Sequence, residues 1–111
     1  MRTDIKATNI ELTDKIKSYI QEKVDMLEKF LGEIQTLNVN FEVELTTHHH
    51  LKGQIYRAEI NLEVPGELLR VEKTEKDLFK AIDKVKDHMA MRIKKYKEKR
   101  IKRINKKRKE N

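Results

Sequence analysis

The chain has 111 residues, of which 41% are charged, and its formal net charge at pH 7 is +7. Hydrophobic residues make up 37%, which is enough for one modest core. No stretch approaches the roughly 20 consecutive apolar residues of a membrane span, and the N-terminus lacks the apolar run of a signal peptide. The absence of cysteine excludes disulfides and thiolate metal sites, so we expect a soluble, cytoplasmic protein.

The first half of the chain predicts a strand, a helix and a second strand. Residues 1–7 alternate between apolar and polar side chains, as a half-buried strand does. Thr13 can cap a helix over residues 13–31, in which apolar residues recur at spacings of three and four, and Gly32 ends it. From residue 37 to residue 46 the period changes to two, which is typical of a strand.

The second half predicts two more strands and a long helix. Residues 56–64 alternate, Pro65-Gly66 marks a turn, and residues 69–72 form a short fourth strand. Thr74 and Asp77 then have the spacing of a capping box.

The last helix is expected from about residue 75 past residue 100, because neither Gly nor Pro interrupts it. Its apolar stripe thins after Tyr96, so we expect the end of the chain to fray in the free protein. The predicted organisation is one domain over residues 1–98 and a basic extension of this helix over residues 99–111, partly disordered when unbound.

The order β-α-β-β-β-α predicts an α/β (α+β) fold with one four-stranded mixed sheet and two helices packed on one face. Two successive hairpins make strands two to four antiparallel. The first strand reaches the second through a helix, so these two are expected to be parallel, by a right-handed crossover.

The charge is concentrated at the C-terminus. Residues 1–91 hold 14 Lys and Arg against 17 Asp and Glu, a net charge of −3, whereas residues 92–111 hold 12 against 2, a net charge of +10. Such a basic block gains binding free energy when it displaces condensed counterions from a polyanion. It therefore predicts a nucleic-acid partner, with anionic lipid as the other polyanion to consider.

Residues with catalytic or metal-binding chemistry are sparse. Ser18 is the only serine and lies within a predicted helix, and three glycines cannot build a phosphate loop, so we expect neither an enzyme nor a cofactor. Asp83 and Asp87 lie one helical turn apart, but neighbouring lysines favour a solvated face over a cation site. The triplet His48–His50 is more typical of an exposed loop than of a metal site, because adjacent side chains in extended chain point in alternating directions.

The predicted outer face of the sheet is acidic. It carries Glu42, Glu44, Glu59, Glu63 and Glu72 against Arg57 and Arg70. The aromatic residues Phe41 and Tyr56 fall on the apolar side, so the outer face lacks the rings on which sheet-type RNA readers stack bases. We therefore expect nucleic acid to meet the helices and the tail. Lys23 is placed inside the apolar stripe of the first helix, where it either packs its stem or contacts a ligand.

Residues 1 to about 99 resemble the bacterial family of ribosome hibernation-promoting factors and ribosome-associated translation inhibitors. The resemblance is carried by Ile5-Lys6-Ala7-Thr8-Asn9-Ile10-Glu11-Leu12-Thr13, by Ile16, Tyr19, Ile20, Lys23, Leu27, Glu28 and Lys29, and by Asp77-Leu78-Phe79-Lys80-Ala81-Ile82-Asp83 with Lys94-Lys95-Tyr96-Lys97.

The resemblance implies a stress or stationary-phase factor, monomeric when free, that binds the small ribosomal subunit with its 16S rRNA, and the whole ribosome, near the decoding centre. It would inhibit translation by occluding messenger RNA and A- and P-site transfer RNA, and stabilise inactive ribosomes or ribosome dimers. The long family form has an additional C-terminal domain that pairs ribosomes. This chain ends without it, so a separate ribosome modulation factor is expected as a partner.

The resemblance also implies which residues bind rRNA. Five lysines match commonly basic family positions: Lys23, Lys29, Lys95, Lys97 and Lys99. Met26, His88 and Met91 stand where relatives commonly have Lys or Arg. Contacts there are either lost or supplied instead by Lys84, Arg92 and Lys94. These eight basic residues, together with Arg100 of the basic run as the ninth, make up the predicted rRNA-binding set.

Two other functions remain open from the sequence. The first is a general double-stranded RNA or nucleic-acid-binding protein that uses the same basic helix and tail. The second is a module that binds anionic membrane. It is disfavoured, because residues 92–111 offer few apolar anchors, namely Ile93, Tyr96, Ile101 and Ile104.

Overall fold

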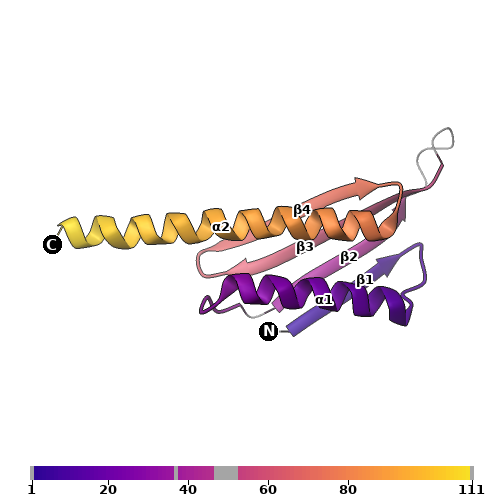
Figure 1. The fold of residues 1–111 in the computed structure, drawn as a ribbon, viewed down its shortest axis with the longest axis horizontal. Coiled ribbons are helices and arrows are strands. Elements are labelled where there is room, and N and C mark those ends of the chain that lie inside the picture. Colours follow the sequence, from indigo (N-terminus) through magenta and orange to yellow (C-terminus); the bar gives the residue numbers. More distant parts are fainter. Residues whose placement is uncertain (1, 37, 47–52, 111) are drawn as a thin grey trace.

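The computed structural model describes residues 2–36, 38–46 and 53–110. Its elements follow in the order β1 (Arg2–Thr8), α1 (Asp14–Leu31), β2 (Asn38–Thr46), β3 (Ile55–Val64), β4 (Glu67–Glu75) and α2 (Leu78–Glu110). The strands form one sheet in the order β1-β2-β3-β4, and both helices lie against the same face of it (Figure 1). The predicted α+β architecture is confirmed.

The pairing register places one row of apolar side chains under the helices. Strand β1 is parallel to β2, with Ile5 opposite Phe41. Strands β2, β3 and β4 are antiparallel in succession, so that Ile60 lies between Phe41 and Val71. Because side chains alternate along a strand, this register turns every second residue of all four strands toward the helices. The predicted strand directions are therefore correct.

Helix α1 begins and ends where the sequence predicts. The Thr13 hydroxyl accepts a hydrogen bond from the Ile16 amide at 3.2 Å, which satisfies one free donor of the first turn. Gly32 ends the helix at a φ of 60°, a backbone conformation that other residues rarely adopt.

The start of α2 differs from the prediction. Thr74 does not cap the helix, because the β3–β4 ladder continues past it and pairs Thr74 with Arg57. Strand β4 is therefore longer than the predicted residues 69–72, and α2 begins at Leu78. Its cap is Asp77, whose Oδ1 accepts a hydrogen bond from the Lys80 amide at 3.1 Å. Because the ladder binds the backbone as far as Glu75, the helix can begin only after it.

The core lies between the two helices and the inner face of the sheet. Its fully buried large side chains are Ile20, Val24, Leu27, Leu31, Val39, Phe41, Ile60, Leu62, Leu69, Ile82, Met89 and Ile93. Tyr96 closes the core at one end, where its hydroxyl donates a hydrogen bond at 2.6 Å to the carbonyl of Pro65 in the β3–β4 turn.

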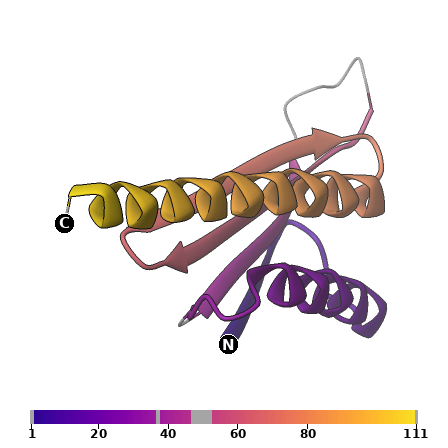
Figure 2. The same ribbon diagram turned by 60° about the vertical axis from the view of Figure 1, so that its left-hand side comes forward.

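Beyond Tyr96, helix α2 leaves the domain. Residues 101–108 are all exposed, and the helix projects past the β3–β4 turn (Figures 1 and 2). The molecule is consequently elongated, measuring 60 × 28 × 17 Å. The division into a domain over residues 1–98 and an extension over residues 99–111 stays a prediction, as does fraying of the last residues in the free protein.

Some predictions fall outside the described residues, namely those on Leu37 and on His48–His50. Within the described ranges, no helix is both long and apolar enough to cross a bilayer, and no three His, Asp or Glu side chains gather closely enough to hold a metal ion.

Candidate nucleic-acid interface

A row of basic side chains runs along the side of α2 that faces β4. Lys84, His88, Arg92, Lys95 and Lys99 follow one another at spacings of four, four, three and four, which keeps them on one side of a helix. An ion pair fixes the direction of this side, since the Lys84 ammonium pairs with the Glu75 carboxylate of β4. The charge of Lys73, also on β4, lowers the pKa of His88, in agreement with this direction. We call Lys84, His88, Arg92, Lys95 and Lys99 the basic row.

His88 is the neutral member of the basic row. Partial burial lowers the pKa of its imidazole below the ordinary value, and the positive charges of Lys73, Arg92 and Lys95 lower it further. Each of these charged neighbours is a cation, so the field around the ring is positive. A positive field at a half-exposed surface attracts phosphate.

Sequence reasoning missed Lys73 and His88 as parts of this surface. At His88 the sequence predicts a contact that is either lost or supplied by a neighbouring basic residue, although its spacing of four to both Lys84 and Arg92 already places it in line with them. Lys73 comes from β4 and reaches the row only through the packing of α2 against that strand, which no local pattern reveals.

Five predicted residues lie away from the basic row, namely Lys23, Lys29, Lys94, Lys97 and Arg100. Lys29 is exposed in the last turn of α1, and Lys94 is exposed on α2. The Lys97 ammonium lies 3.9 Å from where a Cβ on Gly32 would be, at the C-terminal end of α1. The structure thus brings together Lys84, Arg92, Lys95 and Lys99 of the predicted set and distributes the others around the helices.

Lys97 and Arg100 face the end of α1. Together with Leu31, Ile34 and Ile101, they line an open hollow of about 430 Å³ between the end of α1 and the projecting part of α2. Arg100 also places Nη1 3.5 Å from the Tyr96 hydroxyl. These two cations lie on a different side of α2 from the basic row, so the extension is basic around much of its circumference.

Lys23 packs between the helices. Its side chain is 14% exposed, and its ammonium lies 3.4 Å from Asp83 Oδ1 of α2 and 4.7 Å from the centre of the Tyr19 ring. The Tyr19 hydroxyl donates to the same carboxylate oxygen at 2.6 Å. Of the two roles left open by the sequence, this geometry corresponds to a packed stem with a charge partner. Binding of rRNA by Lys23 stays a prediction.

The outer face of the sheet is held together by internal ion pairs. Arg57 pairs with Glu42, with Glu44 at 2.9 Å and with Glu59 at 2.9 Å, and Arg70 reaches Glu59 at 3.1 Å. Burial alone would raise the pKa of the Glu59 carboxyl. Hydrogen bonds from Asn61 and Arg70, with the charges of Arg70 and Arg57, outweigh burial and lower it. This face is acidic in balance, as predicted, and Phe41 and Tyr56 pack on the opposite side.

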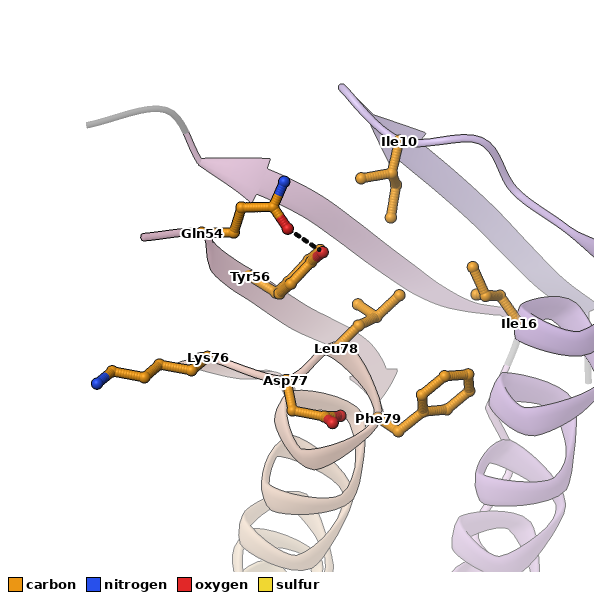
Figure 3. Close-up of a pocket in the computed structure, with 8 residues that line it drawn as sticks. All are labelled: Ile10, Ile16, Gln54, Tyr56, Lys76, Asp77, Leu78 and Phe79. Atoms are coloured by element: carbon orange, nitrogen blue, oxygen red, sulfur yellow. Dashed lines mark hydrogen bonds between the residues drawn. The ribbon is translucent and has the colours of Figure 1, made fainter. Parts of the chain in front are cut away.

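A second hollow, of about 400 Å³, lies at the other end of the molecule (Figure 3). It is bordered by Ile10, Ile16, Tyr56 and Phe79, and the Lys76 side chain points away from it. The carboxylate in its lining, Asp77, already caps α2. The lining is thus mostly apolar, and we assign no ligand to it.

Comparison with known sequences identifies relatives. The family described as "Sigma 54 modulation protein / S30EA ribosomal protein" matches residues 3–101. The chain is 29% identical over 89 residues to the ribosome hibernation promotion factor of Deinococcus radiodurans, covering 80% of this chain and 45% of that protein. It is 27% identical over 97 residues to that of Lactococcus lactis, covering 87% and 50%. The chain thus spans about half the length of these curated relatives.

Two solved structures share the fold. The N-terminal domain of Thermus thermophilus Protein Y superimposes with a TM-score of 0.68 at 31% identity, covering 86% of this chain and 99% of that one. A ribosomal subunit interface protein from Coxiella burnetii gives a TM-score of 0.70 at 14% identity, covering 87% and 98%, a likeness of fold alone. Since the family match covers most of the chain, the protein belongs to the family of sigma 54 modulation proteins and S30EA ribosomal proteins.

Proposed function

We propose that this protein is a ribosome hibernation factor that binds the small ribosomal subunit through α2. The observation that carries the proposal is the distribution of charge: the basic row and the helical extension lie on one side of the molecule, and the glutamate-rich sheet face on the other. Relatives named as ribosome hibernation promotion factors support it. Along the basic row and over the described residues 97–108, α2 carries many Lys and Arg and no Phe, Tyr or Trp, which suits contacts with phosphates of folded RNA.

The inhibition we propose is occlusion, without chemistry. The protein would occupy the decoding region, where messenger RNA and the anticodon ends of A- and P-site transfer RNA bind. The projecting part of α2 supports this, because an exposed helix can enter an RNA-walled channel that a compact domain cannot. Bound protein would keep ribosomes, alone or as dimers with the help of a modulation factor, in an inactive state.

The test is co-sedimentation of the chain with purified small subunits, paired with inhibition of cell-free translation. We expect both at physiological salt, about 0.15 M. Lys95→Gln should weaken binding and make its salt dependence shallower, by roughly 0.7 to 0.9 in the log-log slope. Lys6→Gln is the matched control, since it removes the same charge from the outer face of the sheet and should leave the slope unchanged. Absence of co-sedimentation would refute the proposal.

Occlusion itself needs a competition experiment. Small subunits preloaded with messenger RNA and initiator transfer RNA should bind the protein more weakly than empty subunits. Equal binding to both would refute occlusion while leaving ribosome binding intact. Comparable affinity for random duplex RNA and for small subunits would instead identify a general nucleic-acid-binding protein.

A further inference from the structure

The space between β4 and α2 holds cationic side chains from two elements. Lys73 extends from β4, while His88, Arg92 and Lys95 come from one side of α2. Arg92 and Lys95 lie four and seven residues after His88 on α2. The ion pair between Lys84 and Glu75 brings the helical turn before His88 beside the part of β4 that holds Lys73, and the charge of Lys73 acts on the His88 ring. Lys73, His88 and Arg92 are half-buried, and Lys95 is exposed. Three of the four side chains are therefore partly packed against the protein, and the fourth is open to solvent.

Two carboxylates on these elements, close to the cluster along the chain, are already engaged. Glu75, on the same strand as Lys73, pairs with Lys84. Asp87, the neighbour of His88 along α2, pairs with Lys86 at 2.5 Å. None of the charges that shift the pKa of His88 is negative. Without an anion from outside, the three cations repel one another, and a proton on the imidazole adds to that repulsion.

We propose that Lys73, His88, Arg92 and Lys95 form one phosphate-binding site between β4 and α2, in which His88 takes up a proton when an RNA backbone phosphate binds. This inference rests on the proposed function, because it assigns the RNA contact of one part of the basic row. The proton comes from solvent and adds to the unprotonated ring nitrogen of His88. The resulting imidazolium donates to a phosphate oxygen, which the neutral ring does only from its single N–H.

The coupling between RNA binding and protonation of His88 has a definite direction. In the free protein the pKa of His88 lies below its ordinary value, so the ring is neutral at pH 7. A bound phosphate places negative charge next to the ring and raises its pKa. RNA binding therefore takes up a proton at this site, and affinity rises as the pH falls between the bound and the free pKa values.

The experiment compares three full-length proteins: wild type, His88→Gln, which is neutral at every pH, and His88→Lys, which is charged throughout. Their affinities for purified small subunits are measured from about pH 8 to about pH 6, around the ordinary pKa of histidine. The wild-type to His88→Gln affinity ratio should rise by about threefold to tenfold toward acid. His88→Lys should keep the higher affinity across the range. The other histidines are the same in all three proteins, so their titration cancels in the ratios.

The outcomes separate this inference from the proposed function. Binding by wild type with a flat ratio between wild type and His88→Gln would overturn the proton uptake and leave ribosome binding standing. Absence of binding by wild type at every pH would overturn both.

A second measurement identifies the ligand. The His88 ring is titrated by NMR in the free protein, with a short duplex RNA, and with inorganic phosphate at the same phosphate concentration. We expect its pKa to rise by about one unit with RNA, equivalent to tenfold in affinity, and less with inorganic phosphate. An equal response to both would overturn the assignment to RNA backbone. An unchanged pKa with RNA would overturn the site.

Discussion

The Tyr19 hydroxyl on α1 donates a hydrogen bond to Asp83 Oδ1 on α2 at 2.6 Å, and so joins the two helices that cover the sheet. Lys23 approaches the same oxygen, at 3.4 Å. Phe79 packs edge-on against the Tyr19 ring, with centroids 4.9 Å apart. One carboxylate oxygen of α2 thus meets two polar side chains of α1, beside the apolar core that both helices share.

Asp83→Asn should destabilise the fold, because it leaves the largely buried Lys23 ammonium without its charge partner. We expect the free energy of unfolding to fall by about 1 to 2 kcal/mol, measured by urea denaturation. Asp87→Asn is the matched control on the same helix, since Asp87 is 69% exposed, and it should cost less than about 0.5 kcal/mol. Equal losses of stability in the two variants would show that Asp83 contributes no more to the fold than Asp87 does.

Tyr19 should resist ionisation. Its hydrogen bond to Asp83 raises the pKa of the phenol from 10.0 to about 12, with burial and the Asp83 charge adding to the effect. Because the folded-state pKa is the higher one, this stabilisation is fully present below pH 10 and is lost as the pH rises to about 12. A spectrophotometric titration of wild type and Asp83→Asn checks this. The variant should ionise one tyrosine at lower pH; superimposable curves would contradict the assignment.

Arg57→Met should expose the repulsion among the glutamates of the outer sheet face. Arg57 is 16% exposed and pairs with three carboxylates at hydrogen-bonding distance, so we expect a loss of roughly 3 kcal/mol. Arg70→Met, at a position that is 62% exposed, should cost less than about 1 kcal/mol. Chemical denaturation of both variants gives the comparison, and a larger loss for Arg70→Met would contradict it.

The same network predicts acid sensitivity. The pKa of the Glu59 carboxyl is lowered in the folded protein, so its contribution to stability is present above the ordinary carboxyl pKa. That contribution is lost as the pH falls through the folded-state value. Arg57→Met should weaken this pH dependence, as measured by denaturation at several acidic pH values. An unchanged dependence would place the acid-sensitive group elsewhere.

Truncation should separate the domain from its extension. A chain ending at Arg100 keeps Ile93 and Tyr96 and should unfold with nearly wild-type stability, because residues 101–108 are exposed. A chain ending at Met91 loses both buried side chains and should be less stable by roughly 5 kcal/mol or more. Thermal unfolding of the two chains tests this, and similar stability would show that the core ends before Ile93.

The hydrophobic periods predict all six elements, because each element buries one face and the spacing of apolar residues records which one. Helix α1 and strand β3 lie within one residue of their predicted bounds. The predicted start of α2 was wrong, since Thr74 has the sequence signature of a cap but is bound by the β3–β4 ladder. The pairing of two strands thus outweighed the local capping signal.

The candidate site was less accessible from the sequence. The abundance of Lys and Arg after residue 91 indicates a polyanion partner, but which cations share a side of α2 depends on how the helix packs. The partner of Lys23 is Asp83, 60 residues away along the chain, and Lys73 joins the basic row only across the β4–α2 contact. Neither relationship can be predicted from the spacing of residues that are close in sequence.

The opposite charges of the two sides make the molecule an electric dipole, with its positive end on the long helix. In the field of a polyanion such a body experiences a torque before it makes contact, so an encounter that begins with the sheet in front is turned around or repelled. Productive collisions thereby become a larger share of all collisions. The glutamates far from any proposed contact would thus act on the speed of association, and adding salt should slow it.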